Sequence, residues 1–163
     1  MNYTPLLLTL AVVLTVFFAC EPNVPDEPEV TSGFKSDMLA QVNELRRSGC
    51  RCGAVDYPPV EPLSWNRLLE EAALRHSTDM QVNDIFDHQG SDGSNFGDRV
   101  TDTGYRWRAV AENIAGGYST VDEVVDGWLK SEGHCKNLMG AEFTEMGAAR
   151  KGTLWTQTFA APL

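Results

Sequence analysis

Two histidines and one glutamate are the residues of this chain whose types and surroundings best fit binding or catalysis. His88 and His134 are two of the three histidines in the sequence, and Glu112 stands in an apolar segment, residues 111–115. Imidazole and carboxylate groups bind divalent metals, hold water and act as general acids or bases. If the fold brings them together, these three side chains form a cluster that holds a metal, a water molecule or a ligand carboxylate.

The spacing of these residues does not by itself indicate a metal site, because His88 and His134 are far apart and no HExxH pattern occurs. Glu112 is expected to be buried, and a buried carboxylate must be paired or hydrogen-bonded, so a ligand role and a structural role both stay open. Glu132 is a further candidate, although a charge in the last turn of a helix usually faces water. His76 lies on an apolar helical stripe and is interpreted as a core histidine.

Hydrophobic periodicity predicts three helices that position these residues. The first covers residues 35–47 and the second opens at residues 64–66, with its apolar stripe reaching Met80. The third is capped by Ser119 or Thr120 and is expected to break at Gly133. Between the second and third, residues 83–104 read as a long loop, a kind of segment that is often functional.

Residues 111–115 read as a short element, and the end of the chain reads as a β-hairpin. Residues 154–159 alternate in polarity and are predicted to pair with residues 146–149 across a turn at residues 150–152. Helices first and a hairpin last indicate an α+β domain in which helices pack on a small antiparallel sheet.

The N-terminus predicts export. Residues 6–19 form an apolar run that is too short to span a bilayer, so we expect a signal peptide at residues 1–19. Residues 17–20 are similar to a bacterial lipobox, which predicts a lipid on Cys20 and an extracytoplasmic, membrane-anchored protein. An ordinary signal peptide with an incidental cysteine, and hence a secreted protein, is the alternative. Residues 20–33 are acidic and rich in proline, which predicts a tether before a domain at residues 34–163.

Export is expected to place the three further cysteines in an oxidising compartment, where two of them should form a disulfide. A bond between Cys50 and Cys52 would close a strained ring, so the prediction is a disulfide between Cys52 and Cys135. Cys50 is then the odd thiol, and pairing of Cys50 with Cys135 stays open.

The charge balance restricts the partners. The chain carries 13 basic and 23 acidic residues, a net charge of -10. Such a field repels nucleic acid and anionic lipid surfaces, so no nucleic-acid partner is expected, and membrane contact is expected only through the lipid anchor.

Several linked motifs together resemble the CAP superfamily, which unites cysteine-rich secretory proteins, antigen 5 and plant pathogenesis-related proteins with bacterial SCP-like extracellular proteins. The order and spacing match from about Phe34 to the C-terminus. The segments that carry the resemblance are residues 72–80, 86–88, 111–115 (AENIA), 128–134 (WLKSEGH), 137–138, 146–147 and 155–159.

The resemblance implies a three-layer α-β-α sandwich and a cleft lined by two histidines and acidic residues. It assigns His88, Glu112 and His134 to that cleft and suggests a divalent metal such as zinc as cofactor. The sequence departs from the family where Ser131 replaces a second glutamate of many eukaryotic relatives, a position for which Glu132 is the substitute.

Three functional hypotheses follow. The first is a ligand-binding module whose cleft takes a peptide, a lipid, a metal or a cell-wall component. The alternative is a metal-assisted, protease-like hydrolase in which Glu112 or a histidine acts as general base. The third is a purely structural network that pins the long loop to the last helix, in which case Glu112→Gln mainly lowers stability.

Overall fold

The computed structural model describes residues 32–163. The predicted signal peptide, most of the predicted tether and the lipid site at Cys20 lie outside the described residues. The first helix, α1, covers Ser32–Ser48 and so begins two residues before the predicted domain start. Among the helices of this described part, none has the length and hydropathy that crossing a membrane requires.

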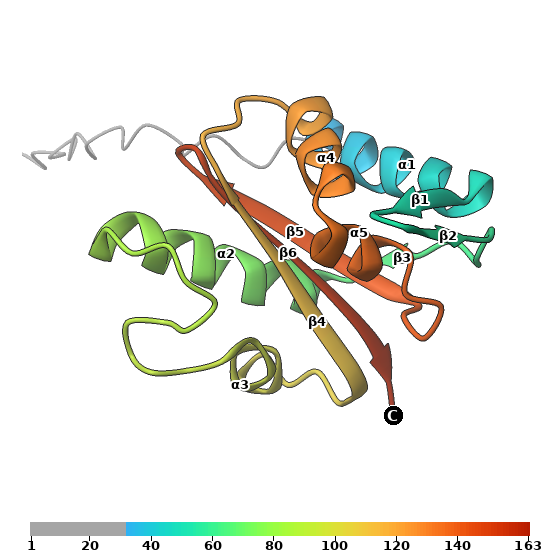
Figure 1. The fold of residues 1–163 in the computed structure, drawn as a ribbon. Coiled ribbons are helices and arrows are strands. Elements are labelled where there is room, and N and C mark those ends of the chain that lie inside the picture. Colours follow the sequence, from blue (N-terminus) through green and yellow to red (C-terminus); the bar gives the residue numbers. More distant parts are fainter. Residues whose placement is uncertain (1–31) are drawn as a thin grey trace, which may run out of the picture.

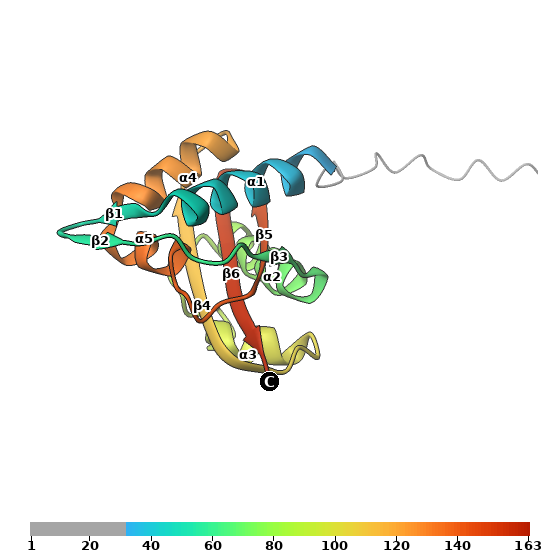
Figure 2. The same cartoon turned by 90° about the vertical axis from the view of Figure 1, so that its right-hand side faces the viewer.

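A four-stranded sheet forms the middle of the molecule (Figures 1 and 2). Its strand order is β3-β5-β6-β4, with β3 parallel to β5 and the other neighbours antiparallel. The strands are β3 (Ser64–Trp65), β4 (Trp107–Gly116), β5 (Glu145–Lys151) and β6 (Leu154–Pro162). The predicted C-terminal hairpin is therefore present, and β4 is an edge strand that pairs with β6 along most of its length.

Helices cover both faces of this sheet. In Figures 1 and 2, α1, α4 (Val121–Lys130) and α5 (Glu132–Leu138) lie on one side, and α2 (Arg67–Asn83) and α3 (Phe96–Asp102) lie on the other. The fold is thus the expected α-β-α sandwich. A separate hairpin of β1 (Cys50–Cys52) and β2 (Val55–Tyr57) packs beside α5.

The central strand β6 shows why both layers are needed. Trp155 and Phe159 belong to the core under α1 and α4, whereas Ala160 belongs to the core under α2. Because successive residues of a strand point to opposite faces, every residue from Trp155 to Ala161 is buried. A Cβ on Gly147 of β5 would lie 2.1 Å from the backbone nitrogen of Glu70, so glycine here allows α2 to approach the sheet closely.

Side-chain caps explain where three helices begin. Asn66 caps α2 by accepting a hydrogen bond from the amide of Leu68. Asn95 with Asp98 and Thr120 with Glu123 form capping boxes at the starts of α3 and α4. Thr120 is one of the two caps expected for the third predicted helix.

The structure corrects three sequence-based expectations. The predicted loop at residues 83–104 contains α3, because the polar residues Asn95 and Asp98 start a helix there. Residues 111–115 belong to the ten-residue strand β4, because pairing with β6 outweighs their ambiguous local pattern. Gly133 does not end a helix: α4 ends at Lys130, and Gly133 lies inside α5.

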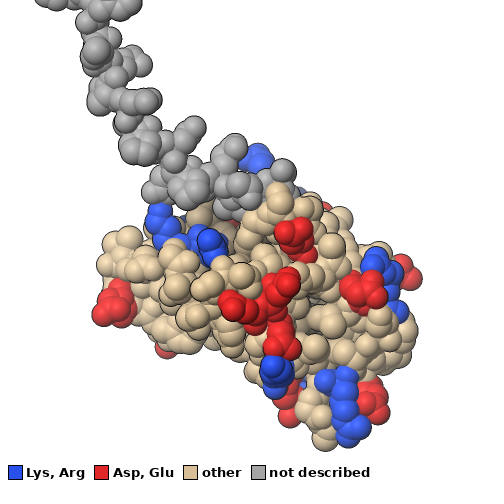
Figure 3. Space-filling view, turned by 90° about the horizontal axis from the view of Figure 1, so that it is seen from above, with Lys and Arg blue, Asp and Glu red and all other residues tan. Residues whose placement is uncertain are grey.

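Charged side chains lie in small, separate groups on the face shown in Figure 3. A group of acidic side chains lies near the centre of this face, and smaller acidic and basic groups surround it on a largely uncharged surface. The acidic excess of the sequence is therefore not gathered into one continuous patch on this face.

Candidate functional site

The candidate site is built around the edge strand β4, where two neighbouring residues point to opposite faces of the sheet. Glu112 faces α2 and α3, where it contacts Arg99 and the histidines of that layer. Asn113 faces α5, where its amide donates to the backbone oxygen of His134 at 3.3 Å. One strand, β4, therefore supplies a site residue to each of the two helical layers.

Glu112 is buried and has a cationic partner. Its carboxylate accepts hydrogen bonds from Nη2 of Arg99 at 2.9 Å and 3.1 Å, and both side chains are almost fully buried. A buried charge that lost this partner would be strongly destabilising. Glu112 therefore cannot act as a free carboxylate while Arg99 is in place.

Arg99 is a site residue that sequence reasoning missed. It lies in α3, and it also donates hydrogen bonds to the backbone oxygens of Ser94 and His88. The capping pair before it and the need of a buried Glu112 for a cation were the available signals.

His88 is held by Glu112 and faces solvent. Its Nδ1 donates a hydrogen bond to Oε1 of Glu112 at 2.8 Å, and 47% of its side chain is exposed. The hydrogen bond to Glu112 raises the pKa of His88. Within residues 32–163 its other nitrogen, Nε2, has no hydrogen-bond partner, so it is the available donor or acceptor of the ring.

His76 is the buried histidine of the same cluster. Its side chain has no exposed surface, and its Nε2 donates to the backbone oxygen of Asp87 at 2.9 Å and lies 3.7 Å from Oε1 of Glu112. Burial lowers its pKa, so the ring is held neutral. The interpretation as a core histidine agrees with this position, although the ring also borders the Glu112 carboxylate.

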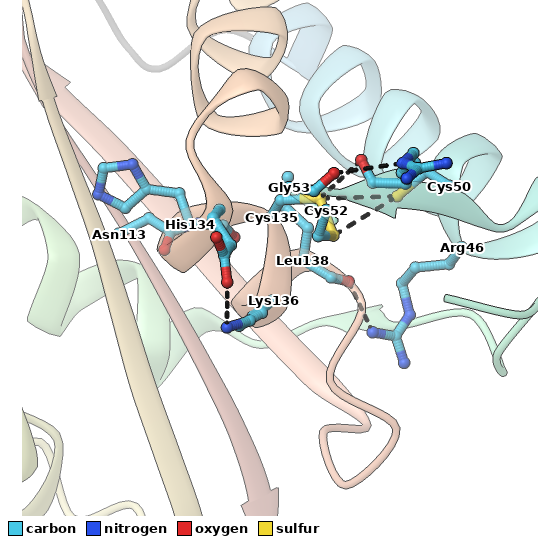
Figure 4. Close-up of a disulfide and its surroundings, with 11 residues drawn as sticks. Arg46, Cys50, Cys52, Gly53, Asn113, His134, Cys135, Lys136 and Leu138 are labelled. Atoms are coloured by element: carbon cyan, nitrogen blue, oxygen red, sulfur yellow. Dashed lines mark hydrogen bonds and ion pairs between the residues drawn. A yellow bond between two sulfur atoms is a disulfide. The ribbon is translucent and has the colours of Figure 1, made fainter. Parts of the chain in front are cut away.

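His134 comes from the opposite layer, in α5. Figure 4 shows its ring beside Asn113 and directed away from the disulfide. The residue is half-buried, and burial, followed by the charge of His88, lowers the pKa of His134. The two imidazoles are therefore within electrostatic reach of each other across the edge of β4.

A ladder of amides ties α5 to this strand. Asn137 donates to the backbone oxygen of Glu112 at 3.2 Å and to the side-chain oxygen of Asn113 at 2.8 Å. Asn113 in turn contacts Gln157 of β6 at 3.3 Å. These bonds fix the position of the helix that carries His134.

The structure brings the predicted residues together only in part. His88 and Glu112 are in direct contact, whereas His134 is related to His88 only through the charge of His88, which lowers the pKa of His134. Glu132 instead forms an ion pair with Lys136 at 2.6 Å and packs against Gly53 of the β1–β2 turn. Its partner is therefore a surface lysine.

Three cysteine sulfurs form a second cluster beside the first (Figure 4). Cys52 and Cys135 are joined in the expected disulfide, and Cys50 is a free thiol. In the described part of the chain, these three are the one set of three or more candidate metal ligands whose donor atoms all lie within 4.8 Å of one another. His88, Glu112 and His134 do not form such a compact set.

An apolar pocket of about 380 Å³ lies close in sequence to His88. It is lined by Asp84, Ile85, Phe86, Gly116 and Leu154. Phe86 is 58% exposed, so its ring offers apolar surface beside this pocket. This open pocket lies at the end of α2 and combines apolar side chains with the carboxylate of Asp84.

Comparison with solved structures supports the fold. An extracellular protein of Bacillus anthracis that contains a SCP domain matches with a TM-score of 0.66 and 27% identity, over 83% of this chain and 44% of that chain. An outer surface protein of Borrelia burgdorferi matches with a TM-score of 0.70 at 19% identity, over 82% and 96%. The structure of NaASP2 with Zn²⁺ matches with a TM-score of 0.57 at 12% identity, over 79% and 80%. The last two likenesses show the fold alone.

Sequence comparison defines the family. The uncharacterized protein YkwD of Bacillus subtilis strain 168 is 39% identical over 103 residues, which cover 61% of this chain and 40% of that protein. The chain thus spans less than half the length of this relative. The model of the cysteine-rich secretory protein family, CAP, matches residues 39–157. Because this match covers most of the chain, the protein belongs to the CAP family.

Proposed function

We propose that this protein is an extracytoplasmic ligand-binding CAP domain in which His88 and His134 bind the ligand together. One observation carries the proposal: Glu112, buried and neutralised by Arg99, binds Nδ1 of His88, a half-exposed ring whose Nε2 has no hydrogen-bond partner within residues 32–163. Glu112 thereby fixes the tautomer and orientation of His88, as carboxylates behind metal-binding histidines do.

The chemistry of the donor groups, two imidazoles, suits a divalent metal such as zinc. Imidazole nitrogen is a preferred zinc ligand, and the residues that would hold the metal are His88 and His134. Glu112 would act behind His88 rather than as a ligand, since Arg99 occupies its carboxylate. With two protein ligands, further coordination positions are left to water or to a donor group of a second ligand.

The apolar pocket supports a ligand with an apolar part. Ile85, Phe86 and Leu154 line it, and Phe86 is two residues from His88. A peptide or lipid that offers a carboxylate or phosphate toward the histidines and an apolar group toward Phe86 fits this combination.

The hydrolase hypothesis has less support from the geometry. That hypothesis needs Glu112 or a histidine as general base. Glu112 is buried and paired with Arg99, so it is poorly placed to accept a proton from a bound water. The lowered pKa of His134 favours its neutral form, which is the form that binds a metal as well as the form that accepts a proton. Ligand binding accounts for the same features without a reaction.

Calorimetric titration with zinc tests the proposal. The double variant Cys20→Ser with Cys50→Ser serves as the parent, so that neither cysteine outside the disulfide binds zinc. We expect saturable binding by this parent, loss of that binding in His88→Ala and in His134→Ala, and a roughly 10–100-fold weaker affinity in Glu112→Gln. Binding should strengthen as the pH rises, because protons compete for His88.

Glu132→Gln is the matched control, because Glu132 was a candidate from the sequence but pairs with Lys136. Its zinc affinity should equal that of the parent. Folded His88→Ala and His134→Ala variants that bind zinc as tightly as the parent would refute the proposal.

We further propose that Cys20 carries a lipid that anchors the domain on the outside of the membrane. The lipobox-like residues 17–20 and the apolar run before them support this. Expression of the full chain in a bacterial host should place it in the membrane fraction, and Cys20→Ser should release it. Equal fractionation of both forms in the soluble, exported fraction would show an ordinary secreted protein instead.

A further inference from the structure

The three cysteines are arranged so that two of them face the third. Cys50 and Cys52 lie two residues apart in β1, and alternate residues of a strand share a face. Both sulfurs therefore point to Cys135 in α5, while Arg51 between them is exposed. Sγ of Cys50 lies 3.7 Å from Sγ of Cys135 and 3.9 Å from Sγ of Cys52.

We propose that Cys50, Cys52 and Cys135 form an intramolecular thiol–disulfide exchange site. The Cys50 thiolate attacks Sγ of Cys135, a Cys50–Cys135 bond forms, and the Cys52–Cys135 bond breaks. Cys52 leaves as a thiolate and takes up the proton that Cys50 gave to solvent. One disulfide and one thiol are present before and after, so the step needs no oxidant or reductant.

Ring size selects Cys135 as the sulfur that is attacked. Its sulfur lies 3.7 Å from that of Cys50, and the sulfur of Cys52 lies at 3.9 Å, so distance alone does not choose between them and Cys50 must move from this side-on position into line with the bond that breaks. Attack on Cys52 would instead close a ring across Arg51 alone, which disulfide geometry disfavours. Exchange thus alternates the partner of Cys135 between two positions of the same strand.

The surroundings favour Cys52 as the resting partner of Cys135. Cys52 has no exposed surface, whereas Cys50 is half-buried and is the cysteine that solvent reaches. Burial raises the pKa of the Cys50 thiol, so most molecules hold it protonated. Apolar side chains pack against the cluster, namely Leu45, Tyr57, Val60, Leu129 and Met139.

The exchange site adjoins the histidine site but does not depend on its function. Cys135 directly follows His134 in α5, and Figure 4 shows the His134 ring and the disulfide on opposite sides of that helix. A change of the partner of Cys135 therefore acts on the helix that positions His134.

Trypsin reports the disulfide partner directly, because Arg51 separates Cys50 from Cys52. The native full chain is incubated with N-ethylmaleimide in mildly alkaline buffer, quenched, and digested without reduction. Cys50 falls in the peptide of residues 48–51, Cys52 in residues 52–67 and Cys135 in residues 131–136. Cys20 falls in the peptide that ends at Lys35 and is counted apart.

We expect labelled Cys52 to accumulate with incubation time, matched by growth of the linked pair of peptides 48–51 and 131–136. Cys50→Ser is the control, in which Cys52 should remain unlabelled. Labelling of the native chain at Cys50 alone would overturn the proposal.

A second variant tests whether the alternative bond fits the fold. In a buffer of oxidised and reduced glutathione, Cys52→Ser should lose both thiols of Cys50 and Cys135 and yield the linked peptides 48–51 and 131–136. A folded Cys52→Ser protein that keeps both thiols in that buffer would also overturn the proposal.

Discussion

The two histidines of the candidate site are held by different kinds of support. His134 lies in α5, which a disulfide joins to β1 and an amide ladder joins to β4. His88 lies in the connection between α2 and α3, and its ring is held by Glu112, whose charge Arg99 balances. One support is covalent and neutral, and the other is ionic.

This difference determines what each support responds to. The Glu112–Arg99 support of His88 depends on charge, so it is sensitive to protonation and to loss of either partner. The support of His134 depends on sulfur chemistry and on neutral amide hydrogen bonds. A change of pH or of a charged residue should therefore displace His88 first, whereas reduction of the disulfide should displace His134 first.

Removal of Arg99 should have the largest effect. Arg99→Met leaves the buried Glu112 carboxylate without its cation, so the free energy of unfolding should fall by about 3–5 kcal/mol. Chemical denaturation measures this.

The double variant Arg99→Met with Glu112→Met removes both charges and should recover part of the lost free energy of unfolding. If its loss equals the sum of the losses in the two single variants, the ionic description of this pair is contradicted.

Removal of the disulfide should rank second. Cys52→Ala with Cys135→Ala opens a crosslink between residues 83 apart in sequence, and should cost about 2–4 kcal/mol. Hydrogen exchange should show α5 losing more protection than α3. Equal loss in both helices would show that the two supports are not separate.

Helix caps provide a matched pair of smaller changes. Asn95→Ala and Thr120→Ala each remove a capping side chain, from α3 and α4, and should each cost about 1 kcal/mol. Because α3 carries Arg99, Asn95→Ala should change the NMR signals of the His88 ring. Thr120→Ala should leave them unchanged, and the same response to both variants would argue against the assignment of α3 to the His88 side.

Protonation should distinguish the histidines without a large change in stability. The folded-state pKa of His88 is raised from 6.5, so its contribution to stability is complete below pH 6.5 and is lost as the pH rises through the raised value. The pKa of buried His76 is lowered, so its contribution is complete above pH 6.5 and is lost as the pH falls through the lowered value. NMR titration should show the pKa of His88 falling in Glu112→Gln; an unchanged value would mean that Glu112 does not hold that ring.

Elements with a strong local pattern were predictable from the sequence. The amphipathic stripe from Leu69 to Met80 became α2, and the alternation from Leu154 to Phe159 became β6. Residues 111–115 were ambiguous, because a short apolar run has no period of its own. Only pairing with β6 makes them part of a long strand.

Within the candidate site, the sequence by itself determined which groups are available: two imidazoles, one carboxylate in an apolar segment, and three cysteines beyond Cys20. The tertiary structure decided how they are used. It paired Glu112 with Arg99, turned Glu132 toward Lys136, and brought Cys50 within 3.7 Å of Cys135. Contacts of this kind form between segments that are far apart in the sequence and depend on burial and charge balance. Local sequence patterns therefore do not predict them.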